Sequence, residues 1–170
     1  SGRLQAGGRL RPVEAGRRRA GLVLQRRVHE KVERRWVAAA LLDQSDQPAR
    51  ERIPPLLLDT PDAGKFAAWF NRHQPDVILG LEVPLLLAWL RELGRAAPRD
   101  VAVVSLDRRS TDRGIAGVRQ DYAKLGANAV DLLVGLTHRN ERGLPANAFT
   151  LLTEGVWQDG RTLAVKRPAA

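Results

Sequence analysis

The sequence contains no cysteine and no methionine among its 170 residues. Without cysteine it can form neither a disulfide bond nor a thiolate nucleophile or metal ligand. Methionine is missing from the first position too, so we expect Ser1-Gly2 to be a processed end rather than a site of translation initiation. No run of about 18 apolar residues occurs, so we expect no membrane-spanning helix.

Aromatic residues are also scarce, at 5% of the chain, but four of them are tryptophan. Trp36, Trp69 and Trp89 fall at apolar-face spacing on predicted helices, and we expect them to pack in the core.

The formal net charge is +9, and a positive field attracts polyanions such as DNA. The arginines are scattered along helix faces and turns without a nucleic-acid-binding motif, so we interpret the charge as solvated surface.

Short apolar runs alternate with amphipathic segments along the first two thirds of the chain. The expected strands are 20–24, 56–58, 76–80 and 101–106, and the expected helices are 29–42, a segment after Pro61 carrying Phe66, Trp69 and Phe70, and 84–93. The last third predicts a strand at 115–118, a helix at 121–136, a loop at 140–147 and a final strand at 149–157. This alternation predicts an α/β fold, a parallel sheet flanked by helices on both faces.

Ligands of such sheets bind beyond the carboxyl ends of the strands. Four segments should meet there, namely 25–29, Asp59, 80–82 and 107–109.

Catalysis has little support in the sequence. Its three histidines lie far apart, and no metal-ligand spacing, phosphate-binding loop or nucleophile elbow is present. We therefore expect a binding protein without a cofactor, not an enzyme.

Several segments of the chain match, in order, the sequence patterns of one known protein family. Residues 98–107, PRDVAVVSLD, are similar to the family pattern P-x-D-(V/L)-x-(V/I)-(V/I)-G-(F/Y)-D, and residues 116–122 resemble its crossing strand T-(T/S)-(V/I)-x-Q. Residues 125–133 are similar to the following helix, and 74–78 and 16–22 resemble two earlier strands. The similarity runs from about residue 16 to 158, in one register and in the family's order. The family that these segments resemble is the lactose-repressor (LacI) family of transcription regulators.

The resemblance implies a periplasmic-binding-protein-like fold of type I, of which this chain holds mainly the C-terminal lobe. The implied domains are a weakly structured segment at 1–15, a sensor domain at 16–158 and a tail at 159–170. Hinge crossings are implied near 115–120 and 147–150. The helix at 121–136 would lack its native sheet, so its apolar side would have to be covered by a second copy, and we expect a homodimer.

The resemblance also implies an effector site. Asp107 stands where the family has a sugar-contacting carboxylate, and a carboxylate can accept two hydroxyl hydrogen bonds. Gln120 and Tyr122 match hinge positions that face the cleft. Leu81 and Glu82 stand where the family often has Asn-Asp, so one polar contact is lost there. The residues alone leave alternatives open: Asp107 could cap a turn, and Gln120 and Tyr122 could take part in ordinary loop packing.

Together these features predict the ligand-sensing domain of a bacterial repressor-like regulator. Its effector would be a small molecule, expected to be a sugar. DNA would be bound by an N-terminal module outside this chain, and the protein would be cytoplasmic, with no membrane partner. The alternative is a solute-binding protein of a sugar uptake system, which would have the same fold.

Overall fold

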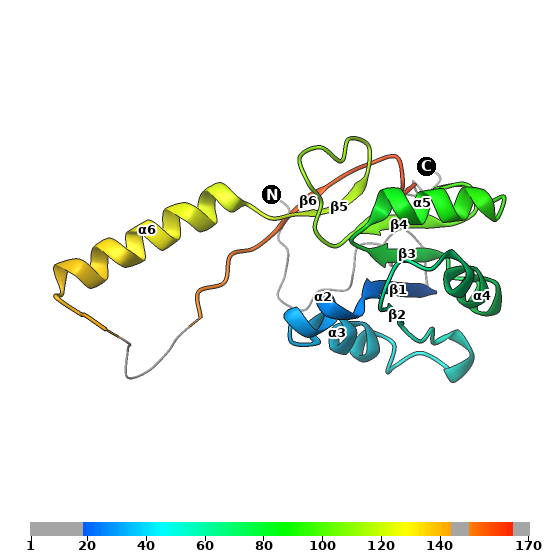
Figure 1. The fold of residues 1–170 in the computed structure, drawn as a ribbon, viewed down its shortest axis with the longest axis horizontal. Coiled ribbons are helices and arrows are strands. Elements are labelled where there is room, and N and C mark those ends of the chain that lie inside the picture. The colour runs from blue at the N-terminus through cyan, green and yellow to red at the C-terminus, as the bar shows by residue number, and fades with distance from the viewer. Residues whose placement is uncertain (1–18, 144–149, 165–170) are drawn as a thin grey trace, which may run out of the picture.

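Six strands form one sheet in the computed structural model, which describes residues 19–143 and 150–164 (Figure 1). The strands are β1 (Ala20–Gln25), β2 (Leu56–Leu58), β3 (Val77–Gly80), β4 (Ala102–Ser105), β5 (Ala116–Arg119) and β6 (Val156–Gln158). The helices are α2 (Arg26–Lys31), α3 (Arg35–Asp43), α4 (Ala63–His73), α5 (Val83–Glu92) and α6 (Tyr122–His138), with a short 3-10 turn, η1 (Ala49–Glu51).

The spatial order of the strands is β2-β1-β3-β4-β5-β6. Neighbouring strands from β2 to β5 pair in parallel, whereas β6 pairs antiparallel to β5, with Val118 opposite Trp157. The predicted parallel α/β sheet is therefore confirmed, and only its last strand, β6, runs in the opposite direction.

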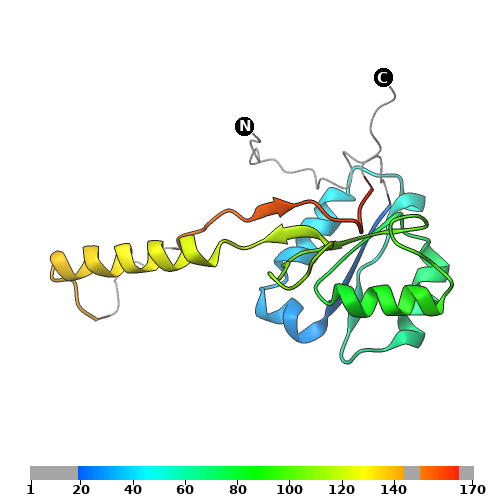
Figure 2. The ribbon, with the colours of Figure 1, turned by 90° about the horizontal axis from the view of Figure 1, so that it is seen from above.

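Helices cover both faces of the sheet, as predicted. Alternate residues of a strand point to opposite faces, and β1 shows this directly. Val23 packs with α4 and α5 in one apolar cluster, while Leu22 and Leu24 pack with Ala40 of α3 in the other. Figure 2 shows α5 and α3 on opposite sides of the strands.

Aromatic rings dominate the first of these clusters. Phe66 is fully buried, and its ring centroid lies 5.2 Å from that of Trp89 and 6.2 Å from that of Trp69. Burying each of these side chains contributes about 1.5–3 kcal/mol. The core positions predicted for Trp69 and Trp89 are confirmed, and Trp36 is half-buried against the opposite face.

The helix predicted at 29–42 is wrong as a single element. The chain forms α2 and α3 instead, because Glu33 and Arg34 adopt left-handed backbone angles, with φ of 51° and 63°. The Arg34 N–H then donates to the carbonyl of His29, which closes the end of α2. An unbroken apolar face cannot reveal such a break, because neither residue is a glycine or a proline.

The C-terminal part differs in extent from the prediction. The final strand covers Val156–Gln158 rather than 149–157. The expected segment 1–15 lies outside the described residues, and so do residues 147–149 of the crossing expected near 147–150. Within the segment expected as a tail, Thr162 and Leu163 are buried. The Thr162 carbonyl accepts from the Val103 N–H, and its hydroxyl accepts from the Ala116 N–H, both at 2.9 Å.

Helix α6 is confirmed as an element and projects away from the sheet in both views (Figures 1 and 2). None of its residues is buried. Leu133 is 64% exposed and Val130 is 59% exposed, so its apolar side has no cover from the described part of this chain. No helix in the described ranges is long and apolar enough to cross a membrane.

Candidate functional site

The carboxyl ends of four parallel strands meet at one edge of the sheet. Gln25 of β1 lies opposite Leu58 of β2, and Gly80 of β3 lies opposite Ser105 of β4. The segments that leave these strands therefore emerge side by side. This is the edge at which the sequence places a ligand.

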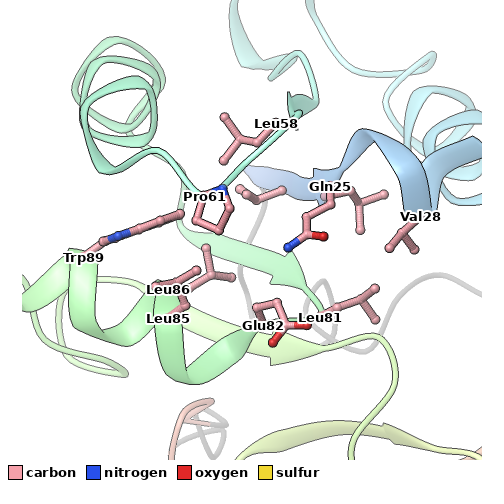
Figure 3. Close-up of a pocket in the computed structure, with 11 residues that line it drawn as sticks. Gln25, Val28, Leu58, Pro61, Leu81, Glu82, Leu85, Leu86 and Trp89 are labelled. Atoms are coloured by element: carbon pink, nitrogen blue, oxygen red, sulfur yellow. The ribbon is translucent and has the colours of Figure 1, made fainter.

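A hollow of about 440 Å³, including the part open to solvent, lies at this edge between β1, β2, α2 and α5 (Figure 3). Its strand-side wall consists of Val23, Leu24, Gln25, Leu58 and Pro61. Its other walls are Val28 of α2, Leu81 and Glu82 after β3, and Leu85, Leu86 and Trp89 of α5. All but Gln25 and Glu82 are apolar.

The deep wall of the hollow belongs to the folded core. Leu86 is 3% exposed, Leu58 4% and Trp89 7%. The Trp89 ring packs against the ring of Phe66. Because these side chains are already fixed by core packing, the hollow is built into the fold and requires no rearrangement to form.

Both polar residues of the hollow carry arginine partners. The Glu82 carboxylate lies 3.6 Å from the guanidinium of Arg109, and the Gln25 Oε1 accepts from Arg27 Nε at 2.8 Å. The side chains of Glu82 and Arg109 are about half and 71% exposed. Such exposed pairs contribute little stability, so their oxygens remain able to exchange partners with a ligand.

Two more of the predicted site residues meet beside this edge. The Tyr122 hydroxyl, at the start of α6, donates to Asp107 Oδ2 at 3.4 Å. The negative charge of Asp107 raises the pKa of Tyr122 above its ordinary value, with smaller contributions from partial burial and the hydrogen bond itself. The pair links the end of β4 to the segment that leaves β5.

Four of the five predicted site residues thus form two groups. Leu81 and Glu82 line the hollow, and Asp107 and Tyr122 contact each other. Gln120 is exposed just after β5, and no contact places it with either group. Arg108, in the segment 107–109 expected at this edge, donates from Nε to the Ile115 carbonyl at 2.9 Å and so holds the loop before β5.

Sequence reasoning missed most of the other wall residues of the hollow. Gln25 and Val28 fall within the segment 25–29 that was expected at this edge, but Pro61 and Leu85 were not singled out, and Trp89 was assigned to packing alone. A signal was present in α5, where Leu85 and Trp89 stand four residues apart in a helix that directly follows a buried strand. Among the described residues, no group of three histidine or acidic side chains could hold a metal ion.

The sequence matches the profile of the periplasmic-binding-protein-like domain family over residues 11–156, and the chain belongs to this family. The fold is that of one lobe of the LacI-type regulators and their type I relatives. A search of the curated proteins finds no match.

Three solved structures illustrate the likeness. A LacI-family regulator from Enterococcus faecium with bound ribose is 18% identical, covered over 92% of this chain and 60% of its own, with a TM-score of 0.60. A PurR-family regulator from Vibrio parahaemolyticus is 14% identical (91% and 59%, TM-score 0.63). The lac repressor dimer bound to its operator and the anti-inducer ONPF is 17% identical (89% and 54%, TM-score 0.62).

These similarities establish the fold, and they also show how much of each related protein this chain corresponds to. The chain spans between 54% and 60% of the length of these three proteins. All three are transcription regulators, and they are distant relatives of this chain.

Proposed function

We propose that this chain is the effector-sensing part of a bacterial transcription regulator and that it has no enzymatic activity. A small effector, for which a sugar is the leading candidate, binds at the carboxyl edge of the sheet. Effector binding controls a DNA-binding module that lies outside these 170 residues. The fold of the domain and the similarity to LacI-type regulators support this proposal.

The observation that carries the proposal is the convergence of candidate contacts at one edge. A preformed hollow and the pair of Asp107 and Tyr122 lie at neighbouring strand ends, since Leu106 N–H already bonds to the Gly80 carbonyl at 2.9 Å. In open α/β sheets this is the place where ligands bind. Asp107 supplies the charged acceptor, and Tyr122 supplies a ring that can stack on an apolar sugar face.

The same proposal covers the assembly and the domains. We propose residues 16–158 as the sensor domain, with one hinge crossing near 115–120 and another near 147–150, and a homodimer as the working form in the cytoplasm. The exposed apolar side of α6 and the dimeric lac repressor support a dimer. Gln120 belongs to the first crossing. It would contact the effector only in the complete protein, in which a second lobe closes the other side of the effector cleft.

The test uses the complete gene product. Its coding region should specify a DNA-binding module upstream of Ser1, and its binding to DNA fragments selected from a random pool should change on addition of one member of a sugar panel. Fluorescence anisotropy of labelled DNA measures that change. A complete product that binds no DNA, with or without any sugar, would rule the proposal out.

A solute-binding protein of an uptake system is the second candidate, because the family profile describes a periplasmic-binding-protein-like domain. It predicts a secretion leader in place of the DNA-binding module. The same upstream sequence therefore decides between the two candidates.

A further inference from the structure

We propose that helix α3 is a self-association surface, through which two copies of this chain pair by antiparallel packing of their α3 helices. The proposal goes beyond the effector function, because it concerns neither the carboxyl edge of the sheet nor the projecting helix α6. It is carried by the composition of the solvent-facing side of α3 and by the charges at the two ends of that helix.

The side of α3 that faces away from the sheet is apolar. The inner side packs on the sheet through Ala40, with Trp36 and Val37 half-buried against the same cluster. The outer side consists of four exposed apolar residues, Ala38, Ala39, Leu41 and Leu42. Leu41 is 51% exposed and Leu42 is 74% exposed. A helix that is apolar on all sides is normally buried, so the outer side of α3 indicates a contact with another surface.

Charged residues bound this apolar side, and each lies at the end of the helix that its charge disfavours. Arg34 and Arg35 stand at the start of α3, and Asp43 is its last residue. The start of a helix is positive and its end is negative, so arginine at the start and aspartate at the end are both unfavourable. Arg35 pairs with Glu33 of the same chain. Arg34 and Asp43 form no ion pair with the described part of the chain.

A second copy related by a two-fold axis would satisfy both ends of the helix. Ala38 and Ala39 lie midway between Arg34 and Asp43 in the sequence. With the axis beside these alanines the two α3 helices run antiparallel, and Arg34 of each copy lies opposite Asp43 of the other. Each charge then meets an opposite charge and the favourable end of the other helix.

The apolar sides complete the match. In the same arrangement Leu41 and Leu42 of each copy cover the outer side of the other copy's helix, which removes apolar surface from water. An apolar face alone would fit many partners. A face whose basic end and acidic end exchange places under two-fold symmetry fits itself, and this charge complementarity selects a second copy as the occupant.

The natural chain contains no cysteine, so one introduced thiol reports on one position. Ala38→Cys, beside the axis, should form a disulfide-linked dimer of the full 170-residue chain on mild oxidation, seen as a doubled mass on a non-reducing gel. Asn71→Cys, at an exposed residue of α4 on the opposite face of the sheet, is the control and should stay monomeric. Adding Leu42→Lys to Ala38→Cys should lower the initial rate of cross-linking about tenfold, because it places a charge in the apolar contact.

Charge reversal tests the antiparallel orientation. In the Ala38→Cys chain, Arg34→Asp should lower the cross-linking rate about fivefold, because it sets aspartates opposite each other. Adding Asp43→Arg exchanges the two charges and should restore the rate. Both changes suit the single helix, since aspartate accepts left-handed backbone angles like those of Arg34, and each new charge lies at the end that favours it. In dilute protein, where the pair is dissociated, the free energy of unfolding should therefore stay close to that of the wild type.

Three outcomes would overturn the proposal. The first is a cross-linking rate at position 38 no higher than at position 71. The second is a charge-exchanged variant that cross-links no faster than Arg34→Asp alone. The third is cross-linking at position 38 that appears only after removal of residues 1–18, since that segment, and not a second copy, would then cover α3.

Discussion

The Tyr122 hydroxyl contacts the Asp107 carboxylate across the junction between the sheet and helix α6, with 3.4 Å between the two oxygens. At this length the hydrogen bond itself is weak. The negative charge of Asp107 is the larger influence, and it raises the pKa of Tyr122 because a neighbouring anion opposes loss of the phenolic proton. The contact ties the first residue of α6 to the loop that follows β4.

This relationship predicts a titration result. Asp107→Asn removes the negative charge but keeps the size of the side chain, so the pKa of Tyr122 should fall toward its ordinary value. Tyr122 is the single tyrosine of the chain, so the near-ultraviolet absorbance of tyrosinate reports on it alone. Asp131→Asn removes a carboxylate further along the same helix and serves as the control. An equal fall in both variants would mean that the overall charge, and not this contact, sets the pKa.

Asp107 should also be needed for effector binding. Asp107→Ala should weaken the binding of the effector by about 1.5–3 kcal/mol, as expected for the loss of a charged hydrogen-bond partner. Isothermal titration calorimetry on the complete protein with both lobes, using the effector found in the sugar panel, measures this loss. Asp46→Ala, at an exposed acidic residue of the loop after α3, is the matched control. Unchanged affinity in Asp107→Ala would remove Asp107 from the site.

The architecture was predictable because its signals are local and repeated. Each buried parallel strand is a continuous apolar run, as in residues 77–80 and 102–105, and each run is followed by an amphipathic segment. The break between α2 and α3 was not predictable in this way. It depends on the left-handed conformation of Glu33 and Arg34, for which neither side chain has a strong preference.

The candidate site was predictable in part. The positions of Asp107 and Glu82 follow from the rule that functional groups gather at the carboxyl ends of parallel strands. The hollow did not follow, since Pro61 and Leu85 come from segments that the rule does not single out, and only the folded chain brings them together with Val28. Apolar residues in a sequence also give no sign of whether they fill a core or line a cavity.

Phe66 should be a major determinant of stability. It has no exposed surface and contacts three aromatic rings, those of Trp69, Phe70 and Trp89. Phe66→Ala should lower the free energy of unfolding by about 3–5 kcal/mol, since it leaves a cavity that these rings cannot fill. Urea denaturation followed by circular dichroism measures the change. Leu42→Ala, at a side chain that is 74% exposed, should change the value by less than about 0.5 kcal/mol, and a comparable loss there would argue against this account of the core.

Two glycine substitutions should have opposite effects. A Cβ added at Gly117 would lie 2.3 Å from the Ser105 carbonyl oxygen, a backbone atom that cannot rotate away, whereas a Cβ at Gly126 meets no atom within 4 Å. Because Ser105 and Gly117 are opposite each other in the pairing of β4 with β5, Gly117→Ala must push these strands apart. It should destabilise the protein by about 1–3 kcal/mol or more.

Gly126 lies inside helix α6, where alanine restricts the unfolded chain and favours the helical conformation. Gly126→Ala should therefore stabilise α6 by about 0.5–1 kcal/mol. Thermal unfolding measures the effect of Gly117→Ala on the sheet. The effect of Gly126→Ala is measured by amide hydrogen exchange within α6, because an exposed projecting helix can open without the rest of the fold. Faster exchange in Gly126→Ala would show that this glycine is required by a contact that α6 makes with another molecule, since nothing in the described part of the chain occupies that space.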